Sequence, residues 1–202
     1  PTPGLDLTET GLNDGKTDRA GRFWAGAMDR KVTRPIGDLY SIDGDFKVTR
    51  VQAGVTVSNG IGWSPDNRTL YHTDTPTQSI YAYDYDIESG AAVNRRVFAK
   101  EAPGPGGPDG MTVDAEGFVW SAQIDRWCIN RYDPAGKLER SVRMPVKRPT
   151  SVMFGGPDLT TLYITTATLD LNDSELAAQP WAGSVLAMDA GVKGLVETRF
   201  AG

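Results

Sequence analysis

The sequence is poor in the residues that most often carry catalysis or cross-linking. Among its 202 residues there is one cysteine, Cys128, and one histidine, His72. A single cysteine excludes an internal disulfide and a cysteine-based zinc site, and it favours a reducing, cytoplasmic compartment. A single histidine leaves one centre for nucleophilic catalysis, and no Gly-x-Ser-x-Gly motif accompanies it. We therefore expect both residues to be packed within the core.

The sequence also lacks an excess of positive charge and any long apolar run. Lys and Arg number 21 against 26 Asp and Glu, which gives a net charge of −5. This balance disfavours binding to nucleic-acid phosphates and to anionic membrane surfaces. The apolar runs end after about four residues, whereas a membrane-spanning helix needs roughly 20. We therefore expect neither nucleic acid nor membrane as a partner.

Helical periodicity is almost absent, and short β-type runs recur instead. Runs rich in Val, Ile, Leu and aromatic residues, bounded by Gly, Asp, Asn and Pro, predict an all-β fold. Four segments share one layout, a turn followed by an aromatic strand, and they are 18–26, 64–74, 113–122 and 155–166. Their aromatic anchors recur at similar spacing and are Trp24, Tyr71, Trp120 and Tyr163.

A second strand follows each aromatic strand and ends in aspartate. The four copies are 39–43, 80–84, 129–133 and 185–189. A repeat of about 43 to 49 residues with four short strands is typical of a β-propeller blade. The alternative is a β-sandwich whose segments are similar by chance. We predict a single β-propeller domain over residues 1–202, with about four blades.

The predicted blade count is small for a propeller. Rings of four blades exist, but closure usually joins the two chain ends within one blade, and residues 1–11 contain no convincing strand. We therefore expect the chain to form the C-terminal two-thirds of a larger ring. A second chain or a further segment would then complete the propeller.

Polar residues occur at equivalent positions ahead of the aromatic anchors. They form the groups 13–15 (Asn-Asp-Gly), 58–60 (Ser-Asn-Gly), 108–110 (Pro-Asp-Gly) and 149–151 (Pro-Thr-Ser). We place each group just before the strand that lines the central channel, so that all point towards one axis. Oxygen ligands repeated around an axis can hold a hard divalent cation. The alternative is that Asn-Gly and Asp-Gly simply form tight turns, and the pattern leaves both open.

These motifs resemble the senescence-marker-protein/gluconolactonase/luciferin-regenerating family. The resemblance extends over 12–202 in the family's order and spacing. Among the segments that carry it are 13–18 (NDGKTD), 21–26 (GRFWAG), 58–60 (SNG), 108–111 (PDGM), 114–117 (DAEG) and 154–156 (FGG). The resemblance implies a six-bladed propeller that binds one divalent metal ion and hydrolyses sugar lactones.

The resemblance also implies roles for individual residues. Asn59 and Asp109 resemble two metal ligands, Asp109 resembles the general base as well, and Asn13 resembles a residue that contacts substrate. The family's third protein ligand, a glutamate in a Glu-Gly-Pro motif, has no counterpart in this sequence. Gly11 stands where animal members have a substrate-contacting arginine, and Lys31 where they have an acid. The sugar pocket is therefore expected to differ from theirs.

Several alternatives stay open at this point. Calcium, zinc, manganese and magnesium all suit an oxygen-rich site, because such sites discriminate only modestly. The chain could also be a calcium-binding regulatory protein without turnover, or an inactive fragment of the propeller. The acidic segment 170–175 could be a second metal site, but we expect a solvated insertion with a short helix capped near Asp173 or Ser174. The basic pair Lys147-Arg148 is expected on a solvated turn.

Overall fold

The structure, a computed structural model, describes residues 6–202, and their strands form four antiparallel sheets. The first sheet contains β1 (Thr10–Thr17), β2 (Phe23–Asp29), β3 (Gly37–Ile42) and β4 (Val48–Val55). The second contains β5 (Ser58–Trp63), β6 (Thr69–Asp74), β7 (Ser79–Asp86) and β8 (Ala91–Lys100). The third contains β9 (Gly107–Val113), β10 (Val119–Ile124), β11 (Cys128–Tyr132) and β12 (Leu138–Arg143). The fourth contains β13 (Pro149–Gly155), β14 (Thr161–Thr166) and β15 (Val185–Asp189).

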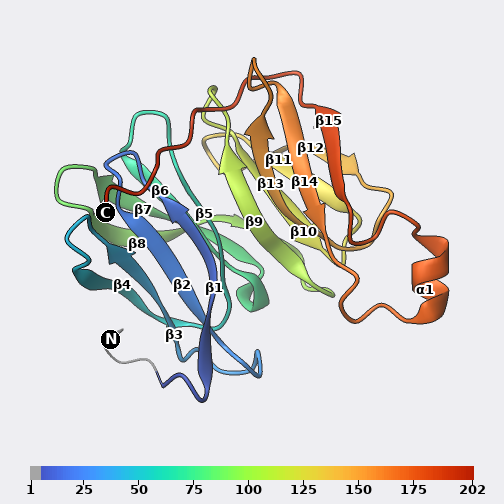
Figure 1. The fold of residues 1–202 in the computed structure, drawn as a ribbon, viewed down its shortest axis with the longest axis horizontal. Helices are drawn as coiled ribbons and strands as arrows, with labels where there is room; N and C mark the ends of the chain where they lie inside the picture. The colour runs from blue at the N-terminus through green and yellow to red at the C-terminus, as the bar shows by residue number, and fades with distance from the viewer. Residues whose placement is uncertain (1–5) are drawn as a thin grey trace.

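The four sheets are arranged as successive blades of a propeller. Strand order within each sheet follows the sequence, and the first strands β1, β5, β9 and β13 contact one another in that order. In Figure 1 the first two sheets lie on the left and the last two on the right. β9, the first strand of the third sheet, lies nearest the middle of the view. The prediction of an all-β propeller arrangement with about four blades is confirmed.

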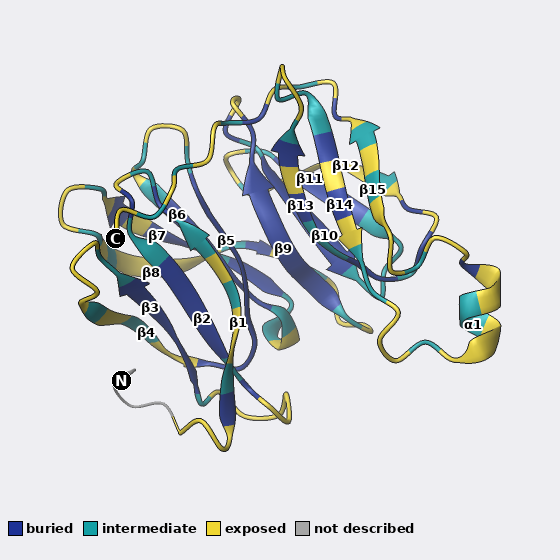
Figure 2. Cartoon of the chain, in the orientation of Figure 1, coloured by how far each residue is buried: buried dark blue, intermediate teal, exposed yellow. Residues whose placement is uncertain are grey.

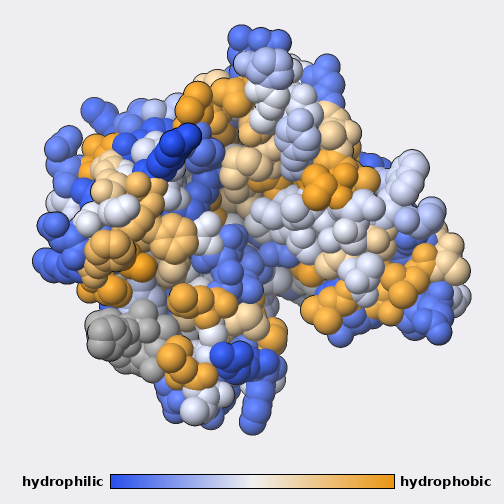
Figure 3. All heavy atoms as spheres, viewed as in Figure 1, coloured by the Kyte–Doolittle hydropathy of each residue, from blue (hydrophilic) through white to orange (hydrophobic). Residues whose placement is uncertain are grey.

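The core is divided into three clusters, one between each pair of neighbouring blades. Trp24 and Trp63 pack between the first and second sheets, Tyr71 and Met111 between the second and third, and Phe154 belongs to the cluster between the third and fourth. Figure 2 shows β5 and β9 buried along their length, while the outer strands alternate or lie exposed. Among the described residues no core cluster joins the first sheet to the fourth, and the surface is indented between those two sides (Figure 3).

The aromatic anchors lie on the second strand of each blade and not, as we predicted, on the strand that lines the axis. In the first and third blades an aspartate before the turn between the first two strands fixes this arrangement. Asp18 accepts hydrogen bonds from two backbone amides of the β1–β2 turn and from Trp24 Nε1 at 2.9 Å. Asp114 binds the β9–β10 turn in the same way and accepts from Trp120 Nε1 at 2.9 Å. The repeated motif is therefore the hairpin between the first two strands.

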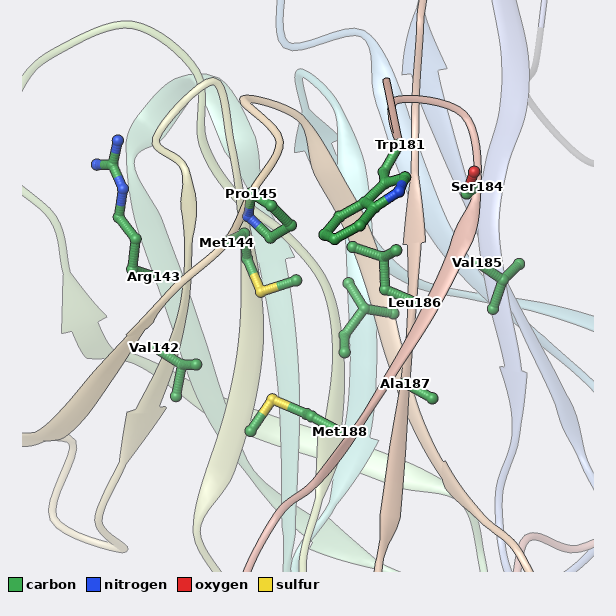
Figure 4. Close-up of a pocket in the computed structure, with 11 residues that line it drawn as sticks. Val142, Arg143, Met144, Pro145, Trp181, Ser184, Val185, Leu186, Ala187 and Met188 are labelled. Atoms are coloured by element: carbon green, nitrogen blue, oxygen red, sulfur yellow. The ribbon is translucent and has the colours of Figure 1, made fainter. Parts of the chain in front are cut away.

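The fourth sheet has a free outer edge. Its third strand, β15, alternates between exposed and partly exposed residues, whereas β3, β7 and β11 lie largely buried beside a fourth strand. A cleft of about 630 Å³ adjoins this edge. Figure 4 shows Trp181, Leu186 and Met188 on one side of the cleft and Met144 and Pro145 on the other. The cleft lies outside the inner strands that carry the polar residues.

Residues 190–202 run back from the fourth sheet to the first (Figure 1). Glu197 forms an ion pair with Lys16 of β1 at 2.8 Å. Phe200 packs edge-on against Phe23 of β2, with ring centroids 6.4 Å apart. This segment ties the two ends of the arc together without adding a strand to either sheet.

The acidic insertion between β14 and β15 forms the short helix α1 (Asp173–Ala178). Asn172 caps it, because its side chain accepts from Glu175 N at 3.0 Å while the Glu175 carboxylate accepts from Asn172 N at 3.1 Å. The expected helix is present, and its cap lies one residue earlier than predicted. A 3-10 turn, η1 (Thr75–Thr77), connects β6 to β7. In the described part of the chain no helix is long and apolar enough to cross a membrane.

Candidate metal and catalytic site

The polar residues singled out in the sequence lie at irregularities inside the inner strands. Asn13 and Asp14 together oppose one residue of β2, and the pairing also slips at Gly60 in β5, at Asp109 in β9 and at Thr150 in β13. A bulge bends its strand and redirects the side chain. The residues were predicted to precede the inner strand, and the correction is that a bulge within that strand presents them. A bulge occurs at equivalent positions in the inner strands of all four blades.

Two glycines allow the inner strands to approach closely. A Cβ atom at Gly60 would lie 2.5 Å from the carbonyl oxygen of Asp109. A Cβ atom at Gly110 would lie 2.2 Å from Ser151 Oγ. Real Cβ atoms do not come this close to other heavy atoms, so these positions need glycine because of the neighbouring strand. Gly60 thus lets the strand of Asn59 lie directly against the strand of Asp109, and Gly110 lets the strand of Asp109 lie against β13.

Hydrogen bonds connect three inner strands at the bulges. Asn13 Nδ2 donates to Asn59 Oδ1 at 2.6 Å and to the carbonyl oxygen of Ser58 at 2.9 Å. Asn59 Nδ2 donates to Thr75 Oγ1 at 2.7 Å. The Thr75 hydroxyl in turn donates to the carbonyl oxygen of Pro108 at 2.7 Å. The structure therefore brings Asn13 and Asn59 into direct contact and links them to the residue before Asp109.

Asp109 is buried, with 9% of its surface exposed. Burial, followed by the negative charge of Asp14, raises the pKa of the Asp109 carboxyl to about 7. The Gly110 amide and the Arg148 guanidinium act in the opposite direction. Burial also raises the pKa of Asp14. A buried carboxyl group whose ionisation is disfavoured by a second carboxylate marks a region where a cation is favourable.

Arg148 departs from the sequence prediction. Instead of lying on a solvated turn, its side chain is only 10% exposed. It lies 3.1 Å from Asp125 and 3.2 Å from Asp170, and it donates to the carbonyl oxygen of Leu169. Because this paired guanidinium also lowers the pKa of Asp109, it is part of the electrostatic surroundings of the site.

The donor set at the bulges fits a hard divalent cation in its chemistry. The candidate ligands are the carboxylate of Asp109 and the Oδ1 atom of Asn59, and oxygen ligands of this type suit calcium and magnesium. No cluster of three or more His, Cys, Asp or Glu side chains with metal-ligating geometry occurs in residues 6–202. Asn59 and Asp109 lie on neighbouring inner strands, and their role as metal ligands stays a prediction.

His72 and Cys128 lie outside this set. His72 is fully buried on β6, and its Nε2 atom lies 2.7 Å from Ser58 Oγ. Burial lowers the pKa of His72 to about 3, so the ring is neutral. It is a packed strand residue, as predicted. Cys128 begins β11 but is only half-buried, so the expectation of a core position is wrong for that residue.

The chain is similar to known proteins over most of its length. The family described as SMP-30/Gluconolactonase/LRE-like region matches residues 2–168. The 6-deoxy-6-sulfogluconolactonase of Pseudomonas putida is 40% identical over 192 residues, which cover 95% of this chain and 66% of the relative. Pentonolactonase XacC of Haloferax volcanii is 38% identical over 194 residues, covering 94% and 66%. Regucalcin of Danio rerio is 40% identical over 197 residues, covering 96% and 67%.

Solved structures give the same result. A calcium-binding protein, regucalcin, from Agrobacterium tumefaciens superposes with a TM-score of 0.90 at 32% identity, covering 96% of this chain and 66% of its own. A luciferin-regenerating enzyme superposes with a TM-score of 0.86 at 33% identity, with the same coverage. The chain spans about two thirds of the length of the curated relatives it matches.

Proposed function

The chain belongs to the SMP-30/gluconolactonase/LRE-like family, and we propose that it carries the reaction centre of a metal-dependent sugar lactonase. Two relatives about 40% identical to it bear the names of sugar lactonases. The observation that carries the proposal is the set of bulges on neighbouring inner strands that presents Asn13, Asn59 and Asp109. Sugar lactones are small, polar and neutral or anionic, and they suit a site lined by amide and carboxyl groups.

A divalent cation would be held by Asn59 Oδ1 and the Asp109 carboxylate. Calcium, zinc, manganese and magnesium all remain candidates for this position. Such an ion, when bound, polarises a substrate carbonyl and increases the acidity of a coordinated water molecule.

Asp109 would act as the general base. Beside a cation its pKa lies lower than in the metal-free protein, so that the carboxyl group is ionised at neutral pH. Asp14 opposes that decrease, because its negative charge raises the pKa of Asp109. The two influences keep Asp109 ionised but still basic enough to accept a proton from the attacking water. This role of Asp14 was not predicted from the sequence.

Asn13 would hold the substrate. Its side chain is on an exposed part of β1, and its Nδ2 atom already donates to Asn59 Oδ1. The Oδ1 atom of Asn13 is therefore oriented away from Asn59 and can accept a hydrogen bond from a sugar hydroxyl group. In this arrangement Asn13 positions the lactone beside Asp109.

We also propose that the functional unit is a six-bladed ring in which these four blades are joined by two more. The free edge of β15 and the open cleft beside it support this proposal, since the corresponding strands of the other blades are covered. The added blades, from a further segment or a second chain, would supply the third ligand, a glutamate.

The test is a lactonase assay on the complete ring with five- and six-carbon aldonolactones and each of the four cations. Asp109→Ala is expected to reduce kcat by at least about 10²-fold, as loss of a general base does. Asp45→Ala, at an exposed turn position, is the matched control and is expected to retain activity. Unchanged kcat and metal content in Asp109→Ala would refute both roles of Asp109. Metal binding that depends on Asn59, without hydrolysis of any lactone, would favour the regulatory protein instead.

A further inference from the structure

We propose that Thr75 is a positioning residue that determines which end of the Asn59 carboxamide faces the proposed metal position. This inference rests on the proposed function of Asn59 as a ligand. Thr75 itself is not on an inner strand. It opens the turn η1 after β6 and reaches both inner strands with a single hydroxyl group.

The direction of the hydrogen bonds follows from the chemistry of the partners. The carbonyl oxygen of Pro108 can only accept, so the one hydroxyl hydrogen of Thr75 is used there, across 2.7 Å. Thr75 Oγ1 is then left to accept from Asn59, which must present its Nδ2 group, also at 2.7 Å. Asn59 Oδ1 consequently faces the other way, where it accepts from Asn13 Nδ2 at 2.6 Å.

The reversed carboxamide is disfavoured at both ends. It would place Asn59 Oδ1 against the lone pairs of Thr75 Oγ1 and its NH₂ group against the NH₂ group of Asn13. An amide oxygen accepts two hydrogen bonds or ligands, and the Asn13 bond uses one of them. One lone pair of Asn59 Oδ1 therefore stays free for a cation.

Thr75 is held firmly enough to impose this orientation. Its backbone N–H donates to the carbonyl oxygen of Val57 at 3.3 Å, and its carbonyl oxygen accepts from Gln78 N at 2.9 Å. Asp74, the residue before it, is buried and accepts from the backbone N–H of Val57 at 3.0 Å. The Gln78 side chain donates to the carbonyl oxygen of Gly106 at 2.5 Å, which ties the turn to the residue just before β9 of the next blade.

The same hydroxyl group also couples the two proposed ligands. It binds the side chain of Asn59 on β5 and the backbone directly before Asp109 on β9. Groups that orient metal ligands in this way typically contribute 10- to 100-fold to metal affinity. Loss of the Thr75 hydroxyl should therefore affect metal binding although Thr75 is not a ligand.

Three variants separate the hydroxyl group from the shape of the residue. Thr75→Val removes the hydroxyl and keeps the volume, whereas Thr75→Ser keeps the hydroxyl. Thr77→Val is the matched control, since the Thr77 hydroxyl in the same turn contacts Asp74 and Tyr81 but not Asn59.

Two measurements are made on each variant of the complete protein. The first is NMR of the metal-free protein, which follows the Asn59 side-chain ¹H–¹⁵N signals and their contacts to residue 75. The second is Mn²⁺ affinity by titration calorimetry. Thr75→Val is expected to shift and broaden the Asn59 signals and to weaken Mn²⁺ binding by about 10- to 100-fold. Thr75→Ser and Thr77→Val are expected to match the parent protein in both.

The inference is overturned if Thr75→Val leaves the Asn59 signals in place, whatever the metal result. It is also overturned if Asn59→Ala weakens Mn²⁺ binding while Thr75→Val does not. If neither Asn59→Ala nor Asp109→Ala changes Mn²⁺ binding, the proposed metal site fails, and the NMR measurement still decides the role of Thr75.

Discussion

His72 makes the stability of this protein dependent on pH in a way that can be isolated cleanly. The ring is fully buried beside Ser58, and burial lowers its pKa to about 3. Its Nδ1 atom has no hydrogen-bond partner among the described residues. Protonation in the folded state would bury a charge together with an unpaired N–H donor, and both are costly.

The size of this pH dependence follows from the difference between the pKa of His72 in the folded protein and in the unfolded protein. An unfolded histidine takes up a proton near pH 6.5, whereas folded His72 does not do so until near pH 3. Between these values the unfolded state binds more protons, so the free energy of unfolding decreases as the pH falls. From pH 7.5 to pH 5.0 the decrease attributable to His72 is about 2 kcal/mol.

The assay compares the parent protein with His72→Gln, which contains no histidine at all because the sequence has only one. Urea unfolding at the two pH values is expected to show a decrease that is larger in the parent by about 2 kcal/mol. NMR of the single imidazole is expected to show no protonation of the folded protein near pH 6. The same pH dependence in both proteins, or a folded-state titration near 6.5, would refute the reasoning.

Two further predictions concern stability and assembly. Asp114→Ala removes the carboxylate that lies 2.7 Å from the buried guanidinium of Arg131, and the free energy of unfolding is expected to fall by about 3–5 kcal/mol. Glu116→Ala, at the largely exposed carboxylate of the same network, is the control and should cost less than about 1 kcal/mol in urea unfolding; equal losses would contradict this account. Without the further blades, the free edge of β15 is expected to pair with a second copy of the chain, and Val185→Lys is expected to reduce this self-association in sedimentation velocity, since an edge lysine blocks strand pairing. Val196→Lys, which is also exposed, should not, and an unchanged sedimentation profile for Val185→Lys would argue against edge pairing.

The repeat of the blades could be predicted from the sequence because it is local. Aromatic strands, terminal aspartates and turn residues each follow from a few neighbouring positions. The inner strands were missed for the same reason. Asn59-Gly60 and Asp109-Gly110 have the chemistry of tight turns, and only the close approach of the neighbouring blade explains why glycine stands there within a strand.

In the candidate site, too, contacts that follow from the repeat could be predicted from the sequence, and contacts particular to one place in the fold could not. The contact between Asn13 and Asn59 joins residues 46 positions apart, yet it was within reach because the two occupy equivalent positions in successive blades. Thr75 and Arg148 have no equivalent in the repeat. The partner of Thr75 depends on how two blades meet, and partners of Arg148 lie in the insertion after β14. A basic residue beside Lys147 gives no sign in the sequence that its side chain will be buried.

The carboxyl group of Asp109 is retained at a cost to the fold. Ionising it at neutral pH in this surrounding costs roughly 4 kcal/mol more than in water. The fold does not require a carboxylate at a bulge of this kind, because the fourth blade has the uncharged Thr150 at the equivalent bulge. A structural role would therefore favour replacement of Asp109 by a neutral residue. A buried acid whose pKa is raised by burial and by the charge of Asp14, on the strand next to that of Asn59, is instead typical of a residue used for proton transfer or cation binding.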